Sequence, residues 1–248
     1  MASLLRRVDP EWLDELPAAD PRAVRSRRDL RLMNRIMGHA PIIRRALGRA
    51  LRVDATPTPI AAFPLKGKGL FPLRIAELGA GDGTLLLRAL PRCATGARLV
   101  FVDRQPVVSV ATISRYAERG FDATVDAADV FDWLRREGPH FDAIVANLFL
   151  HHFEAPQLTE LLALASRRTD VFVACEPRRA RIPLAGSRLL GLIGCNDVTR
   201  HDAHVSVRAG FAGRELSACW PSGAGWILEE RKGGFFSHLF MATAVRAS

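Results

Sequence analysis

From Leu73 onward, short apolar runs alternate with longer stretches of helical periodicity. Five of these runs have the length and composition of buried strands. Strands separated by helices are typical of parallel βαβ units, so the pattern predicts a doubly wound, mostly parallel α/β sheet. The five runs are "LRIAEL", "RLVFVD", "FDATVD", "FDAIVAN" and "DVFVACEP".

The end of the chain breaks this alternation. Two strand-like runs, "GWILEERKGG" and "FFSHLFMATAV", follow each other with only Gly233 and Gly234 between them. A glycine connection between two such runs is typical of a hairpin. We therefore expect the sheet to end in a C-terminal antiparallel pair.

The residues before Val53 have helical periodicity. We expect three helices there, in "DPEWLDEL", "PRAVRSRRDLRLMNRIMG" and "PIIRRALGRAL", and a linker in the Pro- and Gly-rich run "ATPTPIAAFPLKGKGLFP". The chain then divides into an N-terminal helical extension with its linker, residues 1–72, and a main domain, residues 73–248. Met33 and Met37 give the second helix a soft apolar face, so we expect this extension to close over the substrate.

The charge of the chain raises the question of nucleic acid. The formal net charge is +9, and arginine supplies 32 of the 35 basic residues, since only Lys66, Lys68 and Lys232 are lysines. The arginines are scattered, and in the densest run, "RAVRSRRDLRLMNRIM", they interleave with apolar residues at helical spacing. That pattern favours a solvated helix face over an RNA-binding surface.

Other composition features limit the class further. The four cysteines form no C-x-x-C pair, which argues against a zinc site and a disulfide framework. No apolar run is long enough for a signal peptide or a membrane span, so a cytoplasmic protein without membrane attachment is expected.

The segment from Leu73 to Leu90, "LRIAELGAGDGTLLLRAL", reads as strand, tight glycine turn and helix. A dinucleotide fingerprint needs a third glycine three positions after Gly81, but Thr84 stands there and the glycine comes one place early. Glu77 also ends the strand, where a pyrophosphate would be poorly received. A ligand with a cationic centre fits better, and S-adenosylmethionine carries a sulfonium and an ammonium group but no phosphate.

Polar residues at three later strand ends suit the rest of such a ligand. Asp103 ends the second strand, where a carboxylate can accept hydrogen bonds from a ribose diol, unless it caps the following helix. Asp129 opens a helix after the third strand and is a candidate for the adenine, for a helix cap, or for both. The full set of expected cofactor-binding residues is Glu77, Gly79, Ala80, Gly81, Asp103, Arg104, Asp129, Val130, Asn147 and Leu148.

In this order and spacing, "AELGAGDGT", Asp103, "AADVFDW" and "VANLFLHHF" resemble the motifs of class I S-adenosylmethionine-dependent methyltransferases. The resemblance covers about residues 73–245. It implies a seven-stranded Rossmann-like sheet with a final hairpin, and transfer of the sulfonium methyl group to a nucleophile. "AADPRAVRSRRDLRLMN" and "NDVTRHDAHVSVRAGF" are also similar to bacterial small-molecule methyltransferases associated with polyketide-type secondary metabolism.

Histidines are the candidates for a general base, which phenols and carbon acids need. We predict His201 and His204 for this role, with His152 in reserve, because Asp197 would share a helix face with His201 and orient its imidazole. Alternatively, His151 and His152 satisfy backbone groups at a strand end and Asp197 caps a helix. We expect no metal, because no paired carboxylates stand at the expected strand ends.

The acceptor is expected to be a small molecule with a phenolic or polyketide-like O or C nucleophile. Arg178 and Arg200 are candidates for binding it, together with Met33 and Met37. Asn147 is not followed by the Pro-Pro-aromatic run of base-amine methyltransferases, and the chain has one tyrosine, so no basic-aromatic stacking surface stands out. An RNA methyltransferase and a non-catalytic cofactor-binding protein stay open as alternatives, and the sequence does not predict the oligomeric state.

Overall fold

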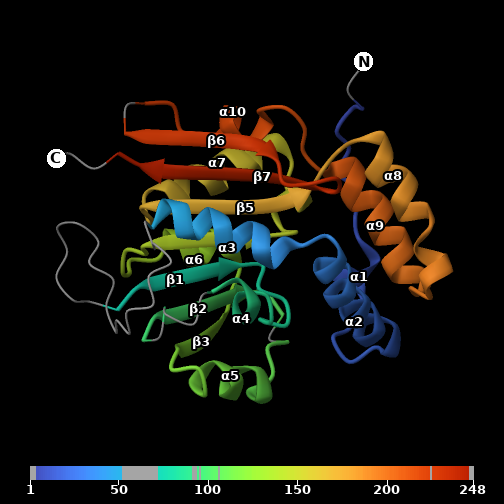
Figure 1. Cartoon of the computed structure of the whole chain (residues 1–248), viewed down its shortest axis with the longest axis horizontal. Coiled ribbons are helices and arrows are strands. Elements are labelled where there is room, and N and C mark those ends of the chain that lie inside the picture. Colours follow the sequence, from blue (N-terminus) through green and yellow to red (C-terminus); the bar gives the residue numbers. More distant parts are fainter. Residues whose placement is uncertain are drawn as a thin grey trace.

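The computed structural model describes residues 4–51, 72–90, 94, 96–105, 107–223 and 225–245. Within these ranges seven strands form one sheet in the order β3-β2-β1-β4-β5-β7-β6 (Figure 1). The first five strands are parallel, and β7 runs antiparallel to both β5 and β6. This confirms the predicted doubly wound sheet and its terminal hairpin. The strands are β1 (Arg74–Leu78), β2 (Arg98–Asp103), β3 (Asp122–Ala127), β4 (Ala143–Asn147), β5 (Val171–Pro177), β6 (Trp226–Lys232) and β7 (Ser237–Ala244).

Helices cover both faces of the sheet because each face is apolar. One core contains residues of α3 (His39–Ala50), α4 (Leu86–Ala89) and α5 (Val110–Ala117). The opposite core contains residues of α6 (Val130–Arg135), α7 (Ala155–Ser166) and α10 (Glu215–Cys219). The other helical elements are α1 (Trp12–Glu15), α2 (Pro21–Ile36), η2 (Leu150–His152), α8 (Arg181–Arg188), η3 (Leu190–Ile193) and α9 (Asp197–Ala209).

The third expected N-terminal helix is part of the sheet's own packing. Ile43, Ala46 and Leu47 of α3 are buried in the same core as β1, β5 and β7. Removal of the chain up to Val53 would therefore take a core helix away, and only α1 and α2 are available as a separate cover. The expected division at residue 72 stays a prediction, since residues 52–71, which include most of the expected linker, lie outside the described residues.

Helices α1 and α2 lie beyond the carboxyl ends of the strands, beside α8 and α9 (Figure 1). Helix α2 begins as predicted at Pro21, and the Asp20 side chain caps it by accepting a hydrogen bond from Arg22 N at 2.7 Å. Arg31 of α2 forms an ion pair with Asp82 of the glycine turn, at 2.6 Å. The N-terminal helices are thus attached to the edge where ligands bind in open α/β sheets.

No helix within the described ranges is long and apolar enough to cross a lipid bilayer.

Candidate active site

The glycine turn after β1 has the conformation that the sequence predicts. Gly79, Gly81 and Gly83 have φ of 64°, 54° and 68°, a region that other residues rarely adopt. A Cβ on Gly79 would lie 2.2 Å from the ring of Phe149, so this position has no room for a side chain. The absence of side chains leaves the turn's backbone open to close approach.

Asp103 braces this turn. Its Oδ2 accepts a hydrogen bond from Gly81 N at 2.8 Å, and its Oδ1 accepts one from Gln105 N at 2.9 Å. The alternative role of helix cap is wrong, because Ser109 caps α5 through Thr112 N. A carboxylate oxygen has a second lone pair, so the fixed carboxylate can still accept hydrogen bonds from two hydroxyl groups.

Glu77 is the unusual group of the turn. Its side chain is buried, and its Oε2 has no hydrogen-bond partner among the described residues. Burial raises its pKa well above the usual value, and the charges of Asp82 and Asp103 add to this effect. An unpaired buried carboxyl group of this kind fits a ligand that brings a positive charge.

We predict that Glu77→Gln stabilises the ligand-free protein at pH 7.5. Because the folded-state pKa of Glu77 lies above its usual 4.5, its ionisation costs stability as the pH rises past that value. The melting temperature should rise by roughly 2–4 °C, the shift that 1 kcal/mol produces in a chain of this size. The affinity for S-adenosylmethionine should fall about tenfold or more, the loss expected for one charge-assisted hydrogen bond.

Glu176→Gln provides the contrast, because Glu176 is a buried carboxylate whose hydrogen bonds are satisfied. This variant should melt at a lower temperature than the wild type. Calorimetric melting of the three proteins at pH 7.5 checks the pair, and a Glu77→Gln protein that melts below the wild type would contradict the prediction.

Asn147 and Leu148 close the other side of the turn. Asn147 at the end of β4 is buried, its amide nitrogen donates to Asn34 Oδ1 at 3.4 Å, and its Oδ1 has no partner within the described part of the chain. Leu148 has φ of 51°, which no other non-glycine residue in that part shares. Strained backbone of this kind gathers at functional sites.

The remaining expected cofactor residues have structural partners. Asp129 caps α6 by accepting a hydrogen bond from Phe131 N at 2.8 Å, so its capping alternative is confirmed, while its role toward adenine stays a prediction. Val130 is buried in the core, and Ala80 N donates to Val102 O at 3.2 Å. Arg104 is exposed directly after β2.

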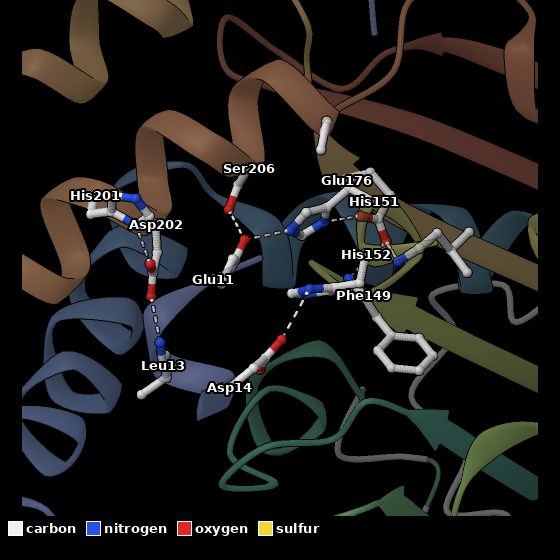
Figure 2. Close-up of polar contacts among 12 residues, drawn as sticks. Glu11, Leu13, Asp14, Phe149, His151, His152, Glu176, His201, Asp202 and Ser206 are labelled. Carbon is white, nitrogen blue, oxygen red and sulfur yellow. Dashed lines mark hydrogen bonds and ion pairs between the residues drawn. The ribbon is translucent and has the colours of Figure 1, made fainter. Parts of the chain in front are cut away.

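A buried ion network stands next to the turn (Figure 2). His151 Nδ1 lies 2.8 Å from Glu176 Oε2, and His151 Nε2 lies 3.2 Å from Glu11 Oε1. Burial alone would lower the pKa of His151, but the hydrogen bonds to Glu11 and Glu176 outweigh it and raise the pKa to about 9. A protonated His151 therefore links Glu176 of β5 to Glu11 of the N-terminal segment through two ion pairs. The alternative that its side chain satisfies backbone groups at the strand end is wrong.

The ion pairs of His151 predict that the stability of the protein depends on pH. Because the pKa of His151 is raised from 6.5 to about 9, its contribution is complete below pH 6.5 and is lost as the pH rises through 9. The difference in melting temperature between wild type and His151→Gln should therefore be largest near pH 6 and should shrink toward pH 9.5. Melting curves across this range check it, with His140→Gln, a surface histidine paired with Asp170, as the control. A difference that does not change with pH would contradict the ion-pair role.

His152 lies on the open side of this network. Its Nδ1 is 3.3 Å from Asp14 Oδ2, and a quarter of its side chain is exposed. Figure 2 shows the ring between Asp14 and Phe149, the residue that packs on Gly79. An Asp-oriented imidazole thus stands beside the glycine turn, with its Nε2 directed away from Asp14.

The other two histidine candidates belong to α9, and Figure 2 shows His201 beside Asp202. His201 stacks on Trp12 with ring centroids 3.9 Å apart, and its Nδ1 lies 2.9 Å from Asp202. The prediction that Asp197 orients His201 is wrong, because Asp197 forms an ion pair with Arg22 at 2.7 Å. His204 is half-buried, and burial, followed by Arg188 and Arg208, lowers its pKa.

The same groups offer an arrangement for a metal ion. Glu11, His151 and His152 each place one potential ligand atom within 4.8 Å of the others. Both nitrogens of His151 already lie within hydrogen-bond distance of the carboxylates of Glu176 and Glu11, however. The expectation of a metal-free site therefore stays our prediction.

The candidates for substrate binding lie in three parts of the fold: directly after β5, in α9 and at the end of α2. Arg178 lines a pocket of about 520 Å³ at the ends of β5, β6 and β7, where its guanidinium donates to Phe235 O at 3.4 Å. Arg200 is exposed and lies against Gly191 of η3. Met33 and Met37 are half-buried at the end of α2. The roles of all four stay predictions.

The acidic partners of His151 and His152 were not predicted from the sequence. Asp14 lies in the four-residue helix α1, and Glu11 is the residue directly before it. The approach of this helix to the sheet depends on tertiary contacts, among them Trp12 N and Leu13 N donating to Asp202. Glu176 had a signal, because a carboxylate stands in the otherwise apolar run "VFVACEP" that forms β5. A charge in a fully buried strand needs a partner, and His151 is that partner.

The comparisons with known proteins agree with this geometry. Residues 75–170 match a family model described as a methyltransferase domain. The matched range contains the glycine turn, Asp103, Asp129 and Asn147. No curated protein matches the sequence significantly.

Two solved structures share the fold. S-adenosylmethionine-dependent methyltransferase SibL, solved in its apo form, is 14% identical with a TM-score of 0.56, over 97% of this chain and 64% of that one. An O-methyltransferase family 2 protein from Planctomyces limnophilus, in complex with apigenin, is 17% identical with a TM-score of 0.55, over 92% of this chain and 63% of that one. The chain therefore spans less than two thirds of either, and at these identities the likeness shows the fold alone.

The sheet order and the matched domain together define the class, a Rossmann-like methyltransferase fold. Residues 75–170 thus match a methyltransferase domain, and the chain shares the fold of S-adenosylmethionine-dependent methyltransferases.

Proposed function

We propose that the protein transfers a methyl group from S-adenosylmethionine to an oxygen or carbon nucleophile of a small molecule. The observation that carries this proposal is the buried, unpaired carboxyl group of Glu77 beside an open glycine turn. A sulfonium or ammonium group suits this position, whereas a pyrophosphate would add negative charge next to Glu77, Asp82 and Asp103.

The residues around the turn fit the cofactor. In this proposal Asp103 accepts hydrogen bonds from the ribose hydroxyls, Asn147 Oδ1 accepts one from the ammonium group, and Asp129 and Val130 border the adenine. Ala80, Gly81, Arg104 and Leu148 supply backbone around it. When bound, the cofactor supplies an already activated methyl group, so the protein has mainly to orient the acceptor and exclude water.

His152 is the general base in this proposal, ahead of His201 and His204. Asp14 orients its ring through Nδ1, which leaves Nε2 to take a proton from an acceptor hydroxyl or carbon acid. The ring's position beside Phe149, which packs on Gly79, supports this order. His201, by contrast, is held in a stack with Trp12. Asp14 is a positioning residue, and burial raises its pKa.

The N-terminal helices α1 and α2 lie over the carboxyl ends of the strands (Figure 1), and this favours a small acceptor over RNA. Glu11 and Asp14 of the N-terminal segment hold His151 and His152, and Arg31 of α2 holds Asp82. Met33 and Met37 would then border the acceptor, and Arg178 would bind an acidic group on it. The complex of the Planctomyces protein with apigenin supports a phenolic acceptor. The proposal includes a role in secondary metabolism in the cytoplasm.

Labelled cofactor tests the acceptor class. The protein is incubated with methyl-labelled S-adenosylmethionine and, separately, with a bacterial small-molecule extract and with total RNA. We expect label in the small-molecule fraction only. Label in RNA would support the RNA methyltransferase instead, and cofactor binding without label in either fraction would support a non-catalytic cofactor-binding protein.

A further inference from the structure

Four large aliphatic side chains of α8 and η3 face solvent. The buried residues of α8 are instead the smaller Pro183 and Ser187. An ordinary surface helix buries its large aliphatic residues, so their exposure along this segment is unusual. The four residues, here named the α8–η3 face, are Ile182, Leu189, Leu192 and Ile193, with exposed fractions of 60%, 58%, 83% and 52%.

The residues of this face are positioned to act together. Ile182 lies in α8, Leu192 and Ile193 lie in η3, and Leu189 lies between the two helices, so the four exposed side chains belong to one continuous stretch of chain. Figure 1 shows α8 on the outer side of α9, away from the sheet. The face is therefore directed outward from the molecule.

Arginines surround the α8–η3 face. Arg188 ends α8, Arg200 of α9 lies against Gly191, and Arg25 of α2 donates to Gly194 O at 2.9 Å. Two acidic side chains of the neighbouring segments are already engaged, Asp29 by Asn196 N and Thr199 Oγ1, and Asp197 by Arg22. The local balance is positive, as it is for the whole chain at +9.

We propose that the α8–η3 face docks on an anionic lipid surface. Aliphatic side chains flanked by arginines are the composition of a helix that lies in the membrane interface, where the apolar side enters the acyl boundary and the guanidinium groups meet the lipid phosphates. A second copy of this chain would cover the apolar side chains too, but it would bring a second set of the same arginines against the first. Charge complementarity therefore selects the anionic bilayer.

Vesicle co-sedimentation of the full chain tests this docking. We expect binding to vesicles of phosphatidylcholine mixed with phosphatidylglycerol, little binding to phosphatidylcholine alone, and weaker binding at high salt. The double variant Leu192→Glu with Ile193→Glu should lower the bound fraction about tenfold, because two charges would replace two of the four exposed aliphatic contacts. Arg188→Glu should remove much of the preference for the anionic vesicles.

Val110→Glu is the matched control. Val110 begins α5 and is 83% exposed, like Leu192, but belongs to a different surface of the protein. It should bind anionic vesicles like the wild type, and unchanged melting temperatures of all variants exclude unfolding. The proposal is overturned by absence of binding, by equal binding to both vesicle types, or by equal loss in Val110→Glu. If the wild type binds no vesicles but forms a concentration-dependent dimer, and only the double variant is monomeric, the face instead binds a second copy of this chain.

Discussion

Replacement of Asp103 by alanine is expected to weaken the binding of S-adenosylhomocysteine by roughly ten-fold to a few hundred-fold. The carboxylate is held by Gly81 N and Gln105 N, which leaves one lone pair on each oxygen for a ribose hydroxyl. Charge-assisted hydrogen bonds contribute about 1.5–3 kcal/mol each, and two bonds to one group do not add fully. Since each 1.4 kcal/mol is about a factor of ten, the stated range follows.

Asp103→Asn keeps one acceptor oxygen without the charge, so its affinity should fall between those of the wild type and Asp103→Ala. Asp122→Ala removes a carboxylate at the start of β3, at the amino ends of the parallel strands, and this variant should bind the ligand like the wild type. Calorimetric titration of the four proteins measures this. Equal affinities for Asp103→Ala and Asp122→Ala would sink the assignment of Asp103 to the cofactor.

His152→Gln is expected to lower the turnover number by about 10²–10⁴-fold, the usual contribution of a general base. The deficit should be largest at low pH and should shrink as the acceptor ionises without help. Affinity for S-adenosylhomocysteine should stay within about twofold of the wild type, because the imidazole acts on the acceptor and not on the cofactor. Turnover measured against pH with the acceptor found by the labelling experiment, together with titration of the cofactor, separates the two effects.

His140→Gln is the matched control for this prediction, since His140 is also paired with an aspartate, Asp170, but lies at the amino end of β4. Asp14→Asn should lower turnover less than His152→Gln, as expected for a positioning residue, and should shift the pH profile. If His201→Gln reduces turnover while His152→Gln does not, the base is His201, as predicted from the sequence.

The sheet could be predicted from the sequence because its signals are local. Each buried strand is a short apolar run, and the glycines of the turn are required by the positive φ of Gly79, Gly81 and Gly83. Asp103 could be placed next to this turn for the same reason, since the carboxyl ends of adjacent parallel strands meet at one edge.

The acidic partners of the histidines could not be predicted, because nothing near them in sequence determines them. Glu11 lies 140 positions before His151, and the two meet only because α1 is held against α9 by Asp202. The helical pairing of Asp197 with His201 was a local rule that a tertiary contact overrode, since Arg22 of α2 engages Asp197. Helix α3 also looked like part of an extension, although its burial against β5 and β7 makes it part of the core.

A direct titration of the wild-type protein with S-adenosylhomocysteine and with NAD tests the central claim, that the turn beside Glu77 holds S-adenosylmethionine. The account predicts a single site for S-adenosylhomocysteine and no measurable binding of NAD, because the pyrophosphate would meet the carboxyl groups of Glu77, Asp82 and Asp103. Preferential binding of NAD in the same experiment would contradict the account and would replace it with a dinucleotide-binding protein.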